Sequence, residues 1–254
     1  MSAASLSRTS SARLSSPPRW LRRYARQARR PLHCLALLLV PVLVYEIGLL
    51  VQPRGGVERP NLVAHGMIQE LLGWLGLGGG FLPGMVFVGS LLVWHRLRRD
   101  SWRINLRVVG LMAVESLALA LPILVWSGFF APATPRLPLD PSLRYMLAIG
   151  AGLYEELVFR LLLLAGLTWL LAGRLSLHRS QSQALAVAIA SLAFALCHFQ
   201  PIGTEPFSLG GFCFRLVAGV YLAVLFVFRG LGIAAGSHVT HNLVMEWFAQ
   251  GGAG

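Results

Sequence analysis

Long apolar runs constrain the fold of this chain more than any other feature of its sequence. Several of them reach the roughly 20 residues that an α-helix needs to cross the hydrocarbon core of a bilayer. The 254 residues are 56% hydrophobic and only 13% charged, with a mean hydropathy of +0.65. Soluble domains carry about 25% charged residues. The sequence therefore predicts an integral membrane protein.

The predicted fold class is all-α, a polytopic membrane helical bundle. The sequence does not show the alternating strands and aromatic girdles of a membrane β-barrel. We expect about seven spans, with six to eight as the range. The expected spans are residues 33–52, 81–95, 106–130, 143–172, 183–201, 208–228 and 231–249. Residues 62–79, which contain several polar side chains, are expected to form an interfacial helix.

The basic residues indicate which ends of the spans face the cytoplasm. All 22 are arginine; eight lie in residues 1–30, and five more lie in the short loop 96–107. Seven spans with a cytoplasmic N-terminus place every dense arginine cluster on one side, in agreement with the positive-inside rule. The net charge of +12 is thereby explained, and nucleic-acid binding is not expected. The absence of lysine reflects a GC-rich genome rather than the chemistry of the protein. The expected location is a bacterial inner (cytoplasmic) membrane, crossed several times by the chain.

Composition divides the chain into three parts. Residues 1–32 are rich in Ser, Arg and Pro and are expected to form a disordered basic arm in the cytoplasm. Residues 33–139 hold the N-terminal membrane helices and the interfacial helix. Residues 140–250 form the part of the membrane bundle that carries the polar motifs described next.

Three apolar segments carry polar residues where surrounding lipid makes them costly. The segments contain "LYEELVFRLLLL" (153–164), "FALCH" (194–198) and "HVTHN" (238–242). The polar residues singled out are Glu155, Glu156, Arg160, His198, His238 and Asn242. A charged side chain at the centre of a membrane helix costs roughly 2.5–3.5 kcal/mol on insertion scales. These residues are therefore candidates for a functional site.

Structural roles explain some of these residues but leave Glu155 unexplained. Glu156 and Arg160 are four residues apart on a helix, so they can neutralise each other as an ion pair. A lone membrane histidine such as His198 is more often a hydrogen-bonding group between helices than a catalyst. Glu155 has only apolar residues three and four positions further along its helix. An unpaired carboxylate in lipid is the strongest functional candidate of the set.

A carboxylate, two histidines and an amide together suit the hydrolysis of a peptide bond. A buried glutamate is a usable general base for water. Histidine and asparagine side chains can donate hydrogen bonds to the oxyanion that forms on the attacked carbonyl. The sequence contains no G-x-S-x-G elbow and no H-E-x-x-H motif, so neither a serine hydrolase nor a zincin is expected.

The three motifs resemble those of a known family. E-E-x-x-x-R at 155–160, F-x-x-x-H at 194–198 and H-x-x-x-N at 238–242 occur in the order found in the CPBP family. This family comprises CAAX proteases and bacteriocin-processing enzymes and includes the type II CAAX prenyl endopeptidases. The resemblance covers roughly residues 140–248. It implies that residues 140–250 are the catalytic membrane core of an intramembrane glutamic endopeptidase.

The resemblance also implies a role for each residue. Glu155 would activate water with the assistance of His198, His238 and Asn242 would bind the oxyanion, and Glu156 and Arg160 would organise the site. No cofactor is expected, although zinc is not excluded, because Glu155, His198 and His238 could supply three ligands. The expected partners are the lipid bilayer and a protein or peptide substrate that is membrane-anchored or bears a C-terminal signal.

Two other functions use the same residues. The buried ionisable groups could form a proton relay in a membrane transporter, or they could belong to a non-catalytic immunity or scaffold protein. Transporters usually show paired repeats or broken helices in both halves, whereas the polar residues here crowd the last part of the chain.

One expectation conflicts with a shared site. At 1.5 Å per residue, Glu155 lies ~18 Å from the outer start of the span 143–172. His198 lies three residues from the outer end of the span 183–201. Either the segment 143–172 is broken or tilted, or the predicted boundaries differ from the true ones.

Overall fold

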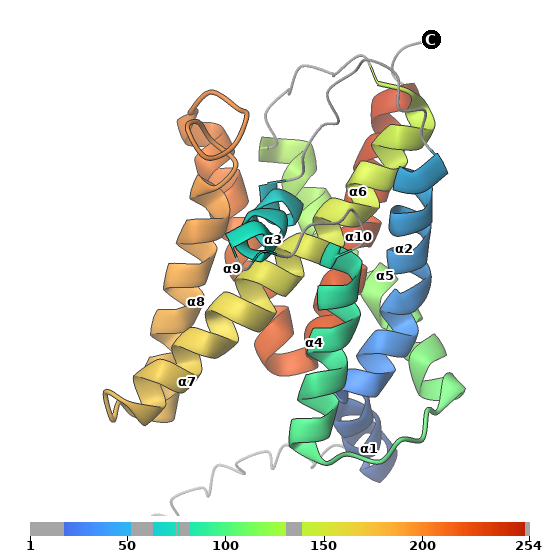
Figure 1. The fold of residues 1–254 in the computed structure, drawn as a ribbon, viewed down its shortest axis with the longest axis vertical. Helices are drawn as coiled ribbons and strands as arrows, with labels where there is room; N and C mark the ends of the chain where they lie inside the picture. Colours follow the sequence, from blue (N-terminus) through green and yellow to red (C-terminus); the bar gives the residue numbers. More distant parts are fainter. Residues whose placement is uncertain (1–17, 52–62, 75, 77–81, 131–138, 252–254) are drawn as a thin grey trace, which may run out of the picture.

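A computed structural model describes residues 18–51, 63–74, 76, 82–130 and 139–251. These residues form a helical bundle (Figure 1), and their only β-structure is an isolated bridge between Phe199 and Glu205. The helices are α1 (Arg19–Ala28), α2 (Pro31–Val51), α3 (Val63–Trp74), α4 (Leu82–Arg98), α5 (Leu106–Phe130), α6 (Pro141–Glu156), the π-helix η1 (Leu157–Leu164), α7 (Ala165–Gly173), α8 (Arg179–Leu196), α9 (Leu209–Arg229) and α10 (Leu231–Gly251).

Helix α10 packs against α2, α5, α6 and α9 and so occupies the middle of the bundle (Figure 1). Its first half is rich in glycine and alanine, and small residues let membrane helices approach closely. A Cβ atom at Gly232 would lie 3.1 Å from the Cα atom of Cys34, and one at Gly236 would meet the side chain of Ser116. Leu231 and Ile233 are fully buried. Three polar residues of α10, Ser237, His238 and His241, are buried as well.

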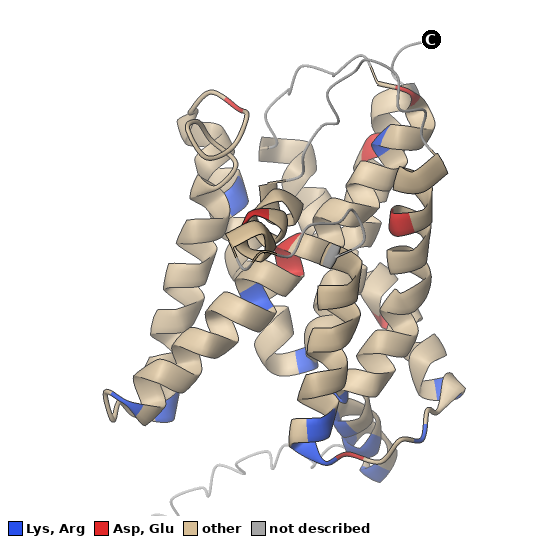
Figure 2. Ribbon diagram, in the orientation of Figure 1, with Lys and Arg blue, Asp and Glu red and all other residues tan. Residues whose placement is uncertain are grey.

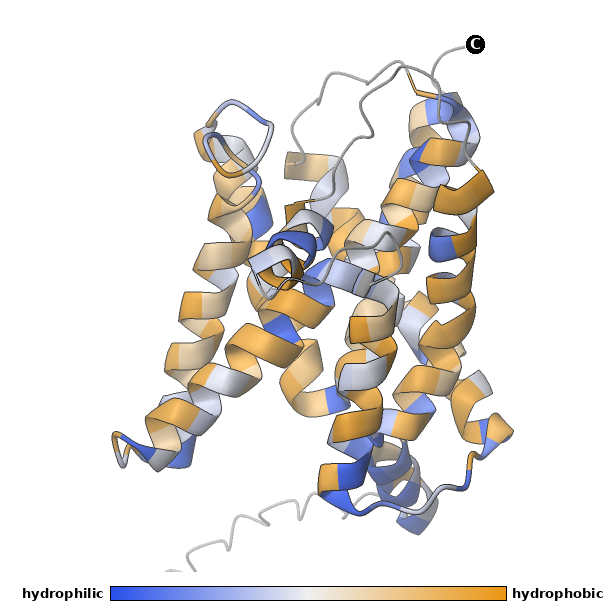
Figure 3. Ribbon diagram, viewed as in Figure 1, coloured by the Kyte–Doolittle hydropathy of each residue, from blue (hydrophilic) through white to orange (hydrophobic). Residues whose placement is uncertain are grey.

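Four helical segments within the described residues are long and apolar enough to cross a membrane. They are Pro31–Val51, Leu106–Phe130, Pro141–Gly173 and Leu209–Arg229. Each coincides with a predicted span. The other three predicted spans coincide with α4, α8 and α10, which do not meet the same limits of length and composition. Hydrophobic residues predominate along the helices (Figure 3), as expected for an integral membrane protein.

The expectation that residues 1–32 form a disordered arm is wrong for its second half. Arg19–Ala28 is helical, whereas residues 1–17 lie outside the described part of the chain. Trp20, Tyr24 and Ala28 recur every four residues and so share one face of α1. Ala28 is fully buried, and the Tyr24 hydroxyl donates a hydrogen bond of 2.5 Å to Glu115 on α5. These long-range contacts hold α1 against the bundle.

The predicted conflict in depth disappears because two elements differ from expectation. The segment Pro141–Gly173 runs obliquely across the bundle (Figure 1) and is interrupted by η1. In η1 the turn is widened, as shown by the N–H of Ala165, which donates to the carbonyl of Arg160 five residues earlier. Helix α8 ends at Leu196, so the predicted span end at residue 201 is wrong. A proline at position 201 disfavours helical backbone at the residue before it.

The crossing of α6 and α10 leads to a prediction about Gly152. A Cβ atom at this position would lie 2.7 and 2.8 Å from the backbone N and Cα atoms of Val239. Since backbone atoms cannot turn aside, we expect Gly152→Ala to destabilise the protein by about 1–3 kcal/mol. The measurement is thermal unfolding of the purified protein in detergent.

Gly166→Ala on α7 is the matched control, because a Cβ there would meet nothing within 4 Å. Alanine favours helix by about 1 kcal/mol over glycine, so this variant is expected to keep or slightly raise the melting temperature. Equal melting temperatures for the two variants would contradict the close crossing of α6 and α10.

Candidate active site

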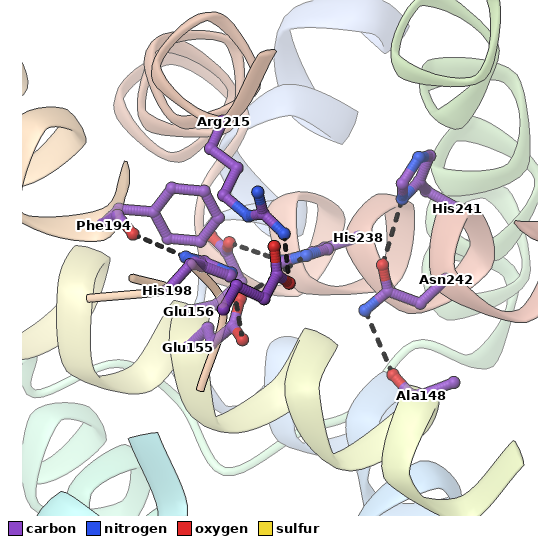
Figure 4. Close-up of polar contacts among 10 residues, drawn as sticks. Ala148, Glu155, Glu156, Phe194, His198, Arg215, His238, His241 and Asn242 are labelled. Atoms are coloured by element: carbon purple, nitrogen blue, oxygen red, sulfur yellow. Dashed lines mark hydrogen bonds and ion pairs between the residues drawn. The ribbon is translucent and has the colours of Figure 1, made fainter. Parts of the chain in front are cut away.

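Three parts of the chain bring side chains together around Glu155. The Oε1 atom of Glu155, on α6, lies 3.9 Å from Nε2 of His198 in the turn after α8. Its Oε2 atom lies 3.7 Å from Nε2 of His238 on α10 (Figure 4). Both separations are too long for a direct hydrogen bond and suit a bridging water. The Glu155 side chain is 15% exposed and that of His198 is 24% exposed, so the group can be reached from outside.

Hydrogen bonds to Nδ1 assign the tautomer of both histidines. Nδ1 of His198 lies 2.8 Å from the carbonyl oxygen of Phe194, and Nδ1 of His238 lies 2.9 Å from Oε1 of Glu156. A carbonyl and a carboxylate oxygen only accept, so both Nδ1 atoms carry hydrogen. In the neutral ring, Nε2 is then an acceptor. Both histidines therefore turn their Nε2 atoms toward Glu155.

Glu156 and Arg160 form the ion pair that their spacing predicts. Nε of Arg160 lies 3.2 Å from Oε2 of Glu156, and the two side chains are 1% and 0% exposed. The other oxygen of Glu156 accepts from His238, and Nη2 of Arg160 donates to the carbonyl of Gly219 on α9 at 3.3 Å. One buried carboxylate thus links α6 to η1 and α10, and Arg160 extends the link to α9.

Phe194, a member of the second motif, packs beside these polar groups. The guanidinium carbon of Arg160 lies 4.4 Å from the centre of the Phe194 ring, a distance typical of a cation–π contact. The same ring lies 5.0 Å from the ring of His198 and 6.0 Å from that of His238, centre to centre. Sequence reasoning quoted this residue without giving it a role; its spacing from His198 was the available signal.

Asn242 lies one turn beyond His238 on α10. Among the described residues, its side chain forms hydrogen bonds with residues other than Glu155. Its Nδ2 atom donates to the carbonyl of Ala148 on α6 at 3.2 Å, and its Oδ1 atom lies 3.0 Å from Nδ1 of His241 (Figure 4). An amide NH₂ group has two hydrogens, so one remains for another acceptor. His241, which the sequence analysis left out, orients this amide.

Arg215, on α9, was also missed. It donates a hydrogen bond of 2.5 Å to Glu205, and its guanidinium carbon lies 5.2 Å from the ring centre of Phe199. The backbone N–H of Glu205 donates to the carbonyl of His198 at 3.2 Å. Arg215 therefore fixes the loop that carries His198. An arginine inside an apolar helix was a signal that could have found it.

The donor set around Glu155 was tested as a metal site. Within the residues that the structure describes, no group of three or more His, Cys, Asp and Glu side chains is arranged to hold a metal ion. The Nδ1 atoms of His198 and His238 are bound to Phe194 and Glu156, which leaves the two Nε2 atoms to face Glu155.

The ion pair predicts that Glu156→Gln and Glu155→Gln differ in stability. Removing the charge of Glu156 leaves Arg160 buried without compensation, which costs about 3–5 kcal/mol. Glu155 is partly exposed and has no contact shorter than 3.7 Å with His198 or His238, so its neutralisation costs far less. We expect the Glu156 variant to unfold at a clearly lower temperature in detergent. Equal melting temperatures would show that the pair does not stabilise the bundle.

Comparison with known proteins gives one result for this part of the chain. Residues 139–244 match the family model described as type II CAAX prenyl endopeptidase Rce1-like. No curated protein and no solved structure matches significantly. The matched region includes every residue of the three motifs. Residues 139–244 are therefore Rce1-like, which is consistent with the CPBP family of CAAX proteases.

Proposed function

We propose that this protein is an intramembrane endopeptidase in which Glu155 activates the water that attacks a peptide bond. The Rce1-like match suggests a CAAX-type intramembrane protease. The observation that supports the mechanism is the position of the Glu155 carboxylate, which faces Nε2 of His198 at 3.9 Å and Nε2 of His238 at 3.7 Å. The substrate is a membrane-anchored protein or one that bears a C-terminal signal, since the site lies within helices that embed in lipid.

The nucleophilic water lies between Glu155 and His198. It donates one hydrogen to the Glu155 carboxylate and the other to Nε2 of His198, which is an acceptor in the neutral ring. These two bonds orient a lone pair of the water oxygen toward the substrate carbonyl. Glu155 then takes the proton as the oxygen bonds to the carbonyl carbon.

His238 is a candidate donor to the oxyanion. Its Nδ1–H is bound to Glu156, so donation from Nε2 requires that this second nitrogen also carry a hydrogen.

Asn242 is a second candidate donor to the oxyanion through its remaining amide hydrogen. When the tetrahedral intermediate collapses, the C–N bond of the substrate breaks. The proton held by Glu155 passes to the leaving amine, which regenerates the carboxylate for the next cycle.

We propose further that α4, α8 and α10 cross the membrane together with the four apolar segments described above. This gives seven spans with the N-terminus in the cytoplasm of a bacterial cell. The distribution of arginine supports this topology: the clusters of arginine residues lie at the end of the bundle formed by α1, the C-terminus of α4 and the turn between α7 and α8 (Figure 2).

The mechanism predicts that Glu155→Gln abolishes cleavage without unfolding the protein. Glutamine keeps the shape of the side chain but cannot accept the proton of water, and loss of a general base lowers the rate about 10²–10⁴-fold. The measurement is cleavage of quenched fluorescent peptides with CAAX termini, with and without a lipid anchor, by the protein in liposomes. Glu70→Gln, at an exposed glutamate of α3, is the matched control. Near wild-type turnover by the Glu155 variant would refute the role of this residue.

The mechanism also predicts that chelation leaves activity intact. A zinc hydrolase would need three or four ligands within about 2.0–2.3 Å of the ion. We expect purified protein to contain far less than one zinc per chain and to retain its cleavage rate after exhaustive treatment with EDTA. One zinc per chain, together with activity that is lost on chelation and restored only by zinc, would make Glu155 a ligand or a metal-assisted base.

A further inference from the structure

A cavity lies away from the Glu155 site, at the arginine-rich end of the bundle (Figure 2). It has a volume of about 680 Å³ and lies between α4, α7, α8 and α9. Three arginines line it: Arg29 just after α1, Arg98 at the end of α4, and Arg179 at the start of α8. We refer to it as the arginine-rimmed pocket. None of the residues assigned to the candidate active site lines it.

The walls of the arginine-rimmed pocket are mainly apolar. Trp94 of α4, Trp169 of α7 and Phe226 of α9 contribute the large side chains. Trp94 and Phe226 are half-buried, whereas Trp169 is 70% exposed on the outside of the bundle. Such walls suit a hydrocarbon chain that enters from the bilayer. A hydrophilic anion alone would make no favourable contact with these apolar side chains.

Positive charge at one end of the pocket is largely uncompensated. Arg98 pairs with Asp100 at 2.9 Å, but Arg29 and Arg179 form no ion pair with any residue in the part of the chain that the structure describes. Arg179 begins an 18-residue helix, whose free N–H groups add partial positive charge at the same end. The backbone carbonyl of Arg29 accepts a hydrogen bond of 3.2 Å from Arg98, so two of the three arginines are held together.

We propose that the arginine-rimmed pocket binds one acidic phospholipid. The phosphate and acidic headgroup lie against Arg29, Arg98 and Arg179, and an acyl chain lies along Trp94, Trp169 and Phe226. Basic pockets between membrane helices favour anionic headgroups because the charge attraction adds to the burial of the chain. The pocket combines both features, which neither a free phosphate nor a neutral lipid matches.

The test compares two lipids with identical acyl chains. Phosphatidylglycerol or phosphatidylcholine is titrated into the delipidated full-length protein in zwitterionic detergent, and bound lipid is counted by native mass spectrometry. We expect one phosphatidylglycerol per chain to bind in preference to phosphatidylcholine. Arg29→Gln and Arg179→Gln should each weaken this binding about fivefold. Arg107→Gln, at an exposed arginine of α5, is the matched control and should leave it unchanged.

A second measurement needs no arginine variant and so covers a failure of those variants to fold. Phosphatidylglycerol with brominated chains should quench tryptophan fluorescence more than brominated phosphatidylcholine does, and replacing both Trp94 and Trp169 by Phe should remove the difference. Millimolar inorganic phosphate should not compete. Equal quenching by the two lipids, equal effects of Arg179→Gln and Arg107→Gln, or full competition by free phosphate would each overturn the proposal.

Discussion

The rest of the structure depends on the neutralisation of one buried carboxylate, that of Glu156. A bilayer offers no water to an ion, so its compensation must come from the protein itself. Here it comes from Arg160 on η1 and His238 on α10. Arg160 also binds the carbonyl of Gly219 on α9 and packs over Phe194 on α8. Satisfying a single charge therefore fixes the mutual positions of α6, η1, α8, α9 and α10.

The cluster of Glu156, Arg160 and His238 orients one of the two histidines that face Glu155. Because Glu156 holds Nδ1 of His238, the opposite nitrogen of that ring can point only toward Glu155. His198 is oriented independently, by the carbonyl of Phe194 and by a loop that the ion pair of Glu205 fixes to α9. His238 is thus oriented by a buried ionic contact and His198 by a partly exposed loop. The Nε2 atoms of both rings face the carboxylate of Glu155.

Local spacing predicted the parts of the site that depend on a single helix. Glu156 and Arg160 are four residues apart and do pair. Glu155 lacks a partner on its own helix, and the structure supplies partners from α10 and from the turn after α8. The contact between Asn242 and Ala148 and the packing of α1 depend on residues far apart in the chain. No pattern within a single segment encodes these contacts, so the sequence alone did not reveal them.

The π-helix η1 makes chain length itself a determinant of the architecture. Its wide turn accommodates an additional residue relative to an α-helix. Deletion of one residue from Leu157–Leu164 would let the segment revert to α-helix and would leave the residues after it close to their present orientation, because the wide turn already absorbs the additional residue. Deletion of one residue between the end of η1 and Trp169, where the helix is α, would instead rotate Trp169 by about 100° away from the arginine-rimmed pocket. The tolerance of this segment to a change in length therefore depends on which kind of helical turn the deletion falls in, a dependence that substitutions at individual positions would never expose.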